Sequence, residues 1–199
     1  MAKNTKTRTR LSPEARKQQL LDVSKEMILK DGLQGFSMEA LARTAGVSSP
    51  LVYNYFESRV ATLQALLARE FAAYAARLTE EVAGAGDFED VVRIFINSNF
   101  DHYAPGNIIP ILESQPELAS AIRAEGEDHG RNVARYLVRV TADTYNLTPR
   151  QAGLLVQMSS GASVAAAQHA ATSRTNRKAA VESALAYILA GLEQASNRN

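Results

Sequence analysis

The amino-acid sequence predicts an all-α fold with a small N-terminal module and a larger helical C-terminal module. Apolar residues recur at intervals of three and four along most of the chain, and strong helix-start signals separate these stretches. No stretch shows the convincing alternation of apolar and polar residues that a half-buried strand requires. With 199 residues, 46% of them hydrophobic, the chain can bury a sizeable core.

The first predicted helix covers residues 13–31. Ser12 can serve as its N-cap, Pro13 suits its first turn, and Gly32 can end it. Two short helices are expected next, over residues 38–45 and 47–56. Their end signals are Ser37 and Gly46 for the first, and Ser48 or Ser49 with Pro50 for the second.

Longer helices are expected after residue 57. One begins near Ser58, where the apolar residues between Val60 and Leu78 form a single stripe. Later starts are marked by Asp87 and by Ser114–Glu117 and Thr148–Gln151, two segments with capping-box spacing and an internal proline. The remaining expected ranges are 88–103, 108–114, 116–145, 149–171 and 176–194.

Positive charge is concentrated at the N-terminal end, although the net charge is only +1. Residues 1–60 carry ten Lys and Arg against six Asp and Glu, whereas residues 61–199 carry twelve against fifteen. The cations of the basic arm are Lys3, Lys6, Arg8, Arg10, Arg16 and Lys17. Such an arm is either a solvated tail or a contact to DNA phosphates, and the motif that follows it favours the second reading.

The composition also indicates a compartment. The chain has no cysteine, which excludes disulfides and thiolate metal sites and fits a reducing environment. No apolar run is long enough to cross a bilayer, and no apolar stretch follows the basic N-terminus as in a signal peptide. We therefore expect a soluble cytoplasmic protein without a membrane partner.

Residues 38–56 have the pattern of a helix-turn-helix. Ala45, Gly46 and Val47 supply a small residue, a glycine that tolerates a left-handed backbone, and an apolar residue that locks the two helices. If Leu41, Ala42 and Val52 face inward, the outward side chains of the second helix are Ser49, Pro50, Tyr53, Asn54 and Tyr55. Their hydroxyl, amide and apolar groups suit base edges and phosphates. A plain helical hairpin is the alternative, but two tyrosines two positions apart cannot share one core face.

Residues 16–67 resemble the DNA-binding domain of the TetR family of bacterial transcriptional repressors. The likeness rests on Met38–Ser48, followed by Leu51–Phe56 and Arg59. It implies an all-α homodimer that uses three N-terminal helices for DNA, binds a small effector in its C-terminal part and dimerises through its last two helices. The implied division is a basic arm over 1–11, a DNA-binding domain over 12–56, and an effector-binding and dimerisation domain over 57–199.

The resemblance also implies roles for single residues. The recognition helix would be Ser48–Phe56, with Ser49, Pro50 and Tyr53 nearest the bases and Asn54, Tyr55 and Arg59 nearest phosphates. Ser37 and Met38 would bring the start of the preceding helix against the DNA backbone. Glu39 would repel phosphate there unless its side chain is turned aside.

An effector cavity is expected among the middle helices, where aromatic and amide side chains recur. The candidate lining residues are Phe95, Asn99, Phe100, Tyr103, His129, Tyr136 and Gln157. The alternative is that the aromatics are ordinary core and the histidines satisfied or surface residues. His102, His129 and His169 are too scattered to suggest a metal site, and we expect neither a metal nor a cofactor.

Dimer contacts are expected on the last two helices, where an Ala-rich helix precedes one with a regular apolar face. The candidate residues are Ala162, Ala166, Val181, Leu185, Ile188 and Leu192. The alternative is that both helices pack only inside one subunit.

The sequence therefore favours a ligand-responsive transcriptional regulator, a repressor that binds a palindromic DNA operator as a dimer and is released by a small molecule. A sequence-independent DNA-packaging protein is one alternative. An enzyme ranks last, because no catalytic grouping, phosphate loop or metal cluster stands out in the sequence.

Overall fold

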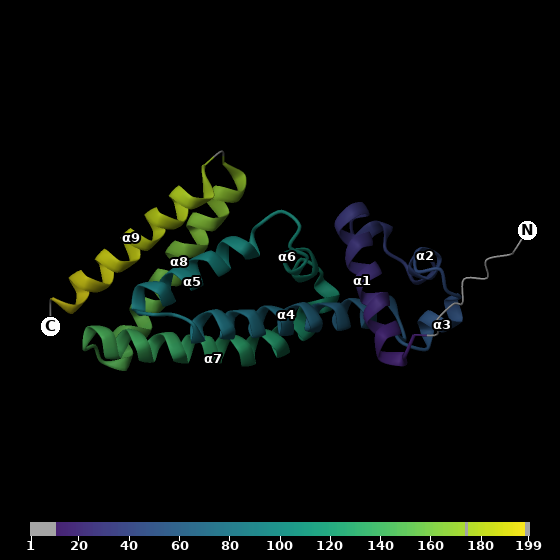
Figure 1. The fold of residues 1–199 in the computed structure, drawn as a ribbon, viewed down its shortest axis with the longest axis horizontal. Helices are drawn as coiled ribbons and strands as arrows, with labels where there is room; N and C mark the ends of the chain where they lie inside the picture. Colours follow the sequence, from purple (N-terminus) through teal and green to yellow (C-terminus); the bar gives the residue numbers. More distant parts are fainter. Residues whose placement is uncertain (1–10, 174, 198–199) are drawn as a thin grey trace, which may run out of the picture. The chain divides into compact units, whose positions relative to one another are not determined.

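The computed structural model describes residues 11–173 and 175–197, apart from the side chains of residues 124–131. Every regular element within these residues is a helix, which confirms the predicted all-α class (Figure 1). The chain divides into two compact units, residues 1–66 and 67–199. None of the helices in the described residues is both long and apolar enough to span a membrane.

The N-terminal unit is a cluster of short helices. Its elements are α1 (Pro13–Asp31), the 3-10 turn η1 (Leu33–Gly35), α2 (Met38–Thr44), α3 (Ser49–Tyr53) and the beginning of α4 (Arg59–Ala83). Two predicted N-caps are confirmed: Ser12 Oγ accepts the Ala15 amide at 3.2 Å, and Ser37 Oγ accepts the Ala40 amide at 3.1 Å. The core of this unit includes Leu20, Leu21, Ile28, Leu41, Val52, Leu63 and Leu66, all at most 2% exposed.

The C-terminal unit contains the longer helices and two short elements. Besides most of α4, the longer helices are α5 (Phe88–His102), α7 (Ala119–Tyr145), α8 (Pro149–Thr172) and α9 (Arg177–Ser196). The short elements are α6 (Ile109–Glu113) and the 3-10 turn η2 (Pro116–Leu118). The predicted capping box at Thr148 and Gln151 is present, and Asp87 caps α5. The segment expected to be one helix over 116–145 instead starts as a 3-10 turn. The capping box predicted at Ser114–Glu117 is wrong, since no side chain caps this start and Ser114 Oγ donates to the Ile111 carbonyl.

Helix α5 lies at the centre of the C-terminal core, where it contacts both α8 and α9. Figure 1 shows α8 and α9 running side by side as the last two helices of the chain. Their buried partners on α5 are Val92, Ile96 and Phe100. From α9 the same cluster takes Val181, Ala184, Leu185, Ile188 and Leu192. One face of α9 is therefore covered by its own chain.

Candidate DNA-binding and ligand-binding sites

The corner between α2 and α3 has the backbone that the sequence predicts. Gly46 has φ +67°, in the left-handed region that side chains disfavour. The Val47 amide donates to the Ala42 carbonyl at 3.0 Å, and the Gly46 amide donates to the Arg43 carbonyl at 3.2 Å. This pair of hydrogen bonds is a Schellman motif, which ends α2 and turns the chain into α3.

Helix α3 has one buried residue, and its other residues are exposed or half-buried. Val52 is fully buried, as is Leu41 on α2, so the predicted inner contacts are confirmed. Of the five residues predicted to face outward, Pro50, Tyr53 and Asn54 are exposed, whereas Ser49 and Tyr55 are half-buried; Ser48, before the helix, is also exposed. Tyr53 keeps 45% of its surface exposed, which is unusual for a large aromatic residue. The structure thus brings the predicted α3 residues together on one outer surface.

Glu39 is turned toward this surface by a link across the corner. The Tyr53 hydroxyl donates a hydrogen bond to Glu39 Oε1 at 3.3 Å. Desolvation, the negative charge of Glu39 and this hydrogen bond together raise the pKa of the Tyr53 phenol above its ordinary value. The carboxylate that would repel phosphate is thus engaged by a neighbouring helix.

Two other predicted DNA contacts, Arg59 and Met38, make contacts within the N-terminal unit. Arg59 donates from Nε to the Phe36 carbonyl and from Nη2 to the Leu33 carbonyl, both at 3.1 Å. The Met38 side chain is 4% exposed, and its sulfur accepts a hydrogen bond from Thr62. Arg59 thus fastens the segment before α2, and Met38 could offer DNA only its backbone amide.

The excess positive charge of the N-terminal 60 residues lies in the arm. Four of the ten Lys and Arg fall within residues 1–10, so residues 11–60 carry six cations and six acids. Lys3, Lys6, Arg8 and Arg10 lie outside the described residues. The described part of the N-terminal unit carries no net charge, so the net attraction of this unit to DNA would come from the four cations of residues 1–10.

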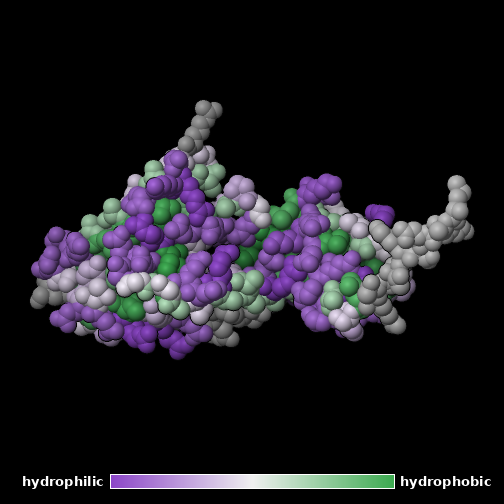
Figure 2. Space-filling view, viewed as in Figure 1, coloured by the Kyte–Doolittle hydropathy of each residue, from purple (hydrophilic) through white to green (hydrophobic). Residues whose placement is uncertain are grey.

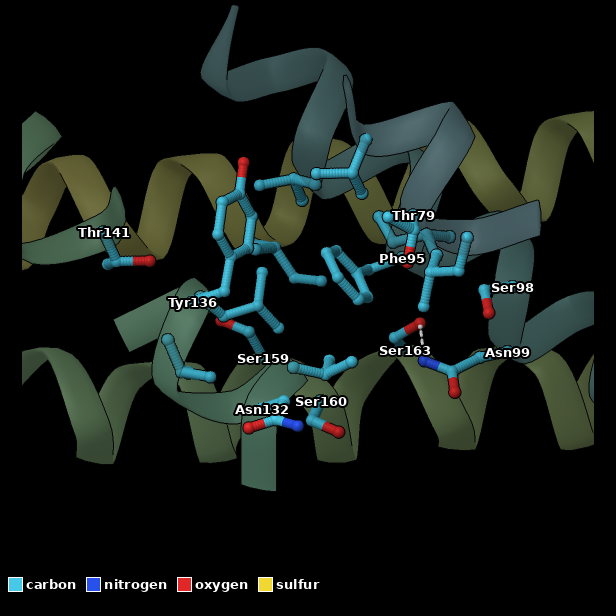
Figure 3. Close-up of a pocket in the computed structure, with 18 of the residues that line it drawn as sticks. Thr79, Phe95, Ser98, Asn99, Asn132, Tyr136, Thr141, Ser159, Ser160 and Ser163 are labelled. Atoms are coloured by element: carbon cyan, nitrogen blue, oxygen red, sulfur yellow. Dashed lines mark hydrogen bonds between the residues drawn. The ribbon is translucent and has the colours of Figure 1, made fainter. Parts of the chain in front are cut away.

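The C-terminal unit holds a cavity of about 780 Å³ among α4, α5, α7, α8 and α9 (Figure 3). Of the predicted lining residues, Phe95, Asn99 and Tyr136 do line it. The lining is mainly apolar, with a few hydroxyl and amide groups, as small-molecule sites usually are.

The other predicted lining residues lie elsewhere or are not described. Phe100 is packed in the core cluster of α5, α8 and α9. The Tyr103 hydroxyl accepts a hydrogen bond from Gln168 at 3.1 Å outside the cavity, and Gln157 is exposed on α8. The side chain of His129 falls outside the described residues.

Sequence reasoning missed the contribution of α8 to this cavity. Val156, Ser159, Ser160 and Ser163 line it and follow the spacing i, i+3, i+4, i+7 of one helix face. Asn99 Nδ2 donates to Ser163 Oγ at 3.0 Å, the bond drawn in Figure 3. The small residues of α8 suggested only close helix packing, although the serine spacing was visible in the sequence.

Four of the six residues predicted to form the dimer contact, all on α9, are covered by their own chain, so the prediction is wrong for these four; Ala162 and Ala166 are half-buried. Val181, Leu185, Ile188 and Leu192 are 3–4% exposed within the single chain. Ala162 and Ala166 also pack against this core, while Ile188 and Leu192 in addition line the cavity. An apolar stripe shows that a helix face is covered, but it does not show which chain covers it.

The opposite faces of α8 and α9 are exposed and carry several apolar or small residues. We call these positions the outer face: Leu154, Met158, Gly161 and Ala165 on α8, and Ala179, Ser183, Ala186, Tyr187, Ala190 and Gly191 on α9. Tyr187, Met158 and Leu154 keep 72%, 61% and 60% of their surface exposed. Figure 2 shows pale green, weakly hydrophobic patches over α9.

The two units together define a helix-turn-helix protein with a helical C-terminal domain. Residues 20–66 match the family described as bacterial regulatory proteins, tetR family. The HTH-type transcriptional repressor NemR of Escherichia coli K12 is 31% identical over 88 residues, which is 44% of each chain. The domain over residues 20–66 is therefore of the tetR family, and the match to NemR spans less than half of that repressor.

Solved structures show the same fold over most of the chain. FadR from Bacillus subtilis, in complex with stearoyl-CoA, superposes with a TM-score of 0.68 at 19% identity, covering 87% of this chain and 98% of that one. The reduced form of E. coli NemR gives 0.63 at 23% identity over 86% and 94%. A TetR-like regulator from Rhodococcus sp. RHA1 gives 0.61 at 24% identity over 92% and 98%.

Proposed function

We propose that this chain is a cytoplasmic transcriptional repressor that binds a palindromic operator as a homodimer and is released by a small-molecule effector. It acts by binding rather than by catalysis. Three parts of the molecule support this function: the outer surface of α3, the outer face of α8 and α9, and the cavity of the C-terminal unit.

The observation that carries the proposal is the division of α3 into one buried and one exposed side. Val52 holds the helix to α2, while Pro50, Tyr53 and Asn54 face outward without serving the core. A second helix that presents such groups beyond a glycine corner suits the major groove. The name of the matched family and that of the repressor NemR point the same way.

Dimerisation would use the outer face. A Cβ added to Gly161 or Gly191 would meet nothing within 4 Å, so packing within the chain does not require either glycine. Each glycine nevertheless costs its helix about 1 kcal/mol relative to alanine. Close approach of a second copy gives these positions a purpose, because small residues let two helices come near each other. Two copies would then place two α3 helices on the two halves of a palindrome.

The cavity would hold the effector. A ligand changes operator affinity only if it binds the two conformations of the dimer unequally, so the effector would have to favour a conformation that does not fit the operator. The sequence has no cysteine, so effector sensing here would not use thiol chemistry. Noncovalent binding of a small molecule in the cavity is therefore the route that we propose.

Selection of genomic fragments with the purified full-length chain tests this function. We expect one family of palindromic sequences, bound at least a thousandfold more tightly than scrambled duplexes, on the order of specific repressors. Equal affinity for operator and scrambled duplexes in competition would instead support the sequence-independent packaging alternative. The genes beside the selected fragments would narrow the class of effector.

A further inference from the structure

We propose that the cavity binds an uncharged, mainly apolar molecule that carries a hydroxyl or carbonyl group, and that Asn99 and Ser163 recognise this group. The inference rests on the proposed role of the cavity as the effector site, and it specifies which chemical class fills it.

The lining of the cavity restricts the charge of its ligand. Among the described residues that line the cavity, none is Asp, Glu, Lys, Arg or His. An ion transferred from water into such surroundings would lose its hydration without gaining a counter-charge from the lining itself, which is unfavourable; two cations near the lining, Arg77 and Arg139, lie against the rings of Tyr74 and Tyr136. A carboxylate, an ammonium group or a phosphate is therefore a poor ligand for this part of the cavity, whereas a neutral molecule pays no such cost.

The walls of the cavity are mainly apolar. Each helix around the cavity contributes large apolar side chains, among them Phe71 and Leu78 of α4, Phe95 of α5 and Leu137 of α7. Burial of a matching apolar body would supply most of the binding free energy. With about 780 Å³, the cavity lies within the range of sites for drug-sized ligands.

Asn99 and Ser163 form a hydrogen-bonded pair in the lining that still has one acceptor and one donor to offer. Asn99 Nδ2 donates to Ser163 Oγ, and Ser163 is only 3% exposed (Figure 3). Within the described residues, neither the side-chain oxygen Oδ1 of Asn99 nor the Ser163 hydroxyl hydrogen has a further partner in the hydrogen bonds of this structure. The pair can thus accept one hydrogen bond from a ligand and donate another, which matches a hydroxyl group and, in part, a carbonyl.

Two other hydroxyl groups of the cavity are partly engaged. The hydroxyl groups of Tyr74 and Ser98 share one hydrogen bond, which uses the hydrogen of one of them. The Tyr136 ring has the Arg139 guanidinium 5.7 Å from its centroid. Asn99 and Ser163 form a hydrogen-bonded pair in the lining, and such a pair can select among neutral ligands, because a site built around a buried hydrogen bond discriminates against a ligand that lacks the partner group.

The test uses probes that share one alkyl chain and differ in charge. Nile red, a neutral dye, reports occupancy of the cavity in the full-length protein, which has no tryptophan. Decan-1-ol, decanoate, decylammonium and decanoyl-CoA are then compared as displacing ligands. We expect decan-1-ol to bind at least tenfold more tightly than each charged compound. Tighter binding of any charged compound, or failure of both Nile red and decan-1-ol to bind, would overturn the inference.

Two variants test the polar pair. Asn99→Leu and Ser163→Ala should each weaken decan-1-ol at least fivefold but leave the affinity for 1-fluorodecane within twofold, because that compound lacks the hydroxyl hydrogen. Equal loss for both compounds would show that the pair only shapes the cavity. Gln157→Leu is the matched control, because it makes a similar replacement at an exposed position of α8 outside the lining.

The result is separable from the proposed function, because the displacement assay contains no DNA. If the chain binds decan-1-ol but selects no operator, the inference about the cavity stands and the proposed regulatory function fails. If the chain selects an operator and decanoate releases it, the regulatory function stands and the inference about the cavity fails.

Discussion

Two glycines of the N-terminal unit have different backbone requirements, and replacing them gives a graded prediction. Gly46 at the corner has φ +67°, whereas Gly32 after α1 has φ +75° and ψ 172°. A Cβ added at either position would meet nothing within 4 Å. The cost of a substitution therefore comes from the backbone conformation and not from a clash.

The expected magnitudes follow from the two regions of conformational space. Gly46→Ala should cost about 1–2 kcal/mol of unfolding free energy, and Gly46→Asn less, because asparagine visits the left-handed region more readily. The Gly32 conformation is essentially restricted to glycine, so Gly32→Ala and Gly32→Asn should both cost about 1–3 kcal/mol. Asparagine should thus rescue position 46 and not position 32.

Hydrogen exchange of peptides covering α2 and α3 measures this cost in the N-terminal unit alone. Each loss of about 1.4 kcal/mol speeds exchange about tenfold, provided that exchange is limited by the opening equilibrium. Gly35→Ala is the control, because Gly35 lies in a turn without positive φ and the added Cβ makes an ordinary 3.4 Å contact. If Gly32→Asn is as mild as Gly46→Asn, the conformational reasoning is refuted.

Three further predictions concern charge, assembly and Arg59. Removal of residues 1–10 should reduce the slope of log affinity for DNA against log salt concentration by up to about 3–4 per chain, measured by fluorescence anisotropy. An unchanged slope would show that the arm is a solvated tail. Ala190→Glu should shift the chain toward monomer in light scattering, whereas Ala72→Glu, at an exposed alanine of α4, should not; equal behaviour would exclude the outer face. Arg59→Met should lower the stability of the N-terminal unit by about 2 kcal/mol, seen by hydrogen exchange, because two hydrogen bonds from a charged group are lost. A salt slope reduced by about one, with stability unchanged, would restore its phosphate role.

The helices of this protein could be predicted because their end signals are local. Ser12, Ser37, Asp87 and Thr148 cap the helices that follow them, through bonds within three or so residues of chain. The corner at Gly46 is equally local, since both of its hydrogen bonds return to α2. Such features need no knowledge of the tertiary structure.

Contacts between distant segments could not be predicted in the same way. Nothing near Arg59 in the sequence indicates that its guanidinium reaches the carbonyls of Leu33 and Phe36. The apolar stripe of α9 could face either its own core or a second copy, and α5 settles the choice. The cavity serines on α8 were missed because the cavity is formed by side chains from five helices. The spacing of the serines along α8 does not by itself indicate that the other four helices converge on them.

The central claim is that the exposed side of α3 contacts DNA bases. The most direct measurement is the affinity of Tyr53→Ala for the selected operator and for a scrambled duplex, with thermal unfolding to confirm that the variant is folded. We predict a loss of about ten- to a hundredfold for the operator, about the cost of a lost base contact, and no comparable loss for the scrambled duplex. Operator affinity equal to that of the unaltered chain would contradict the claim.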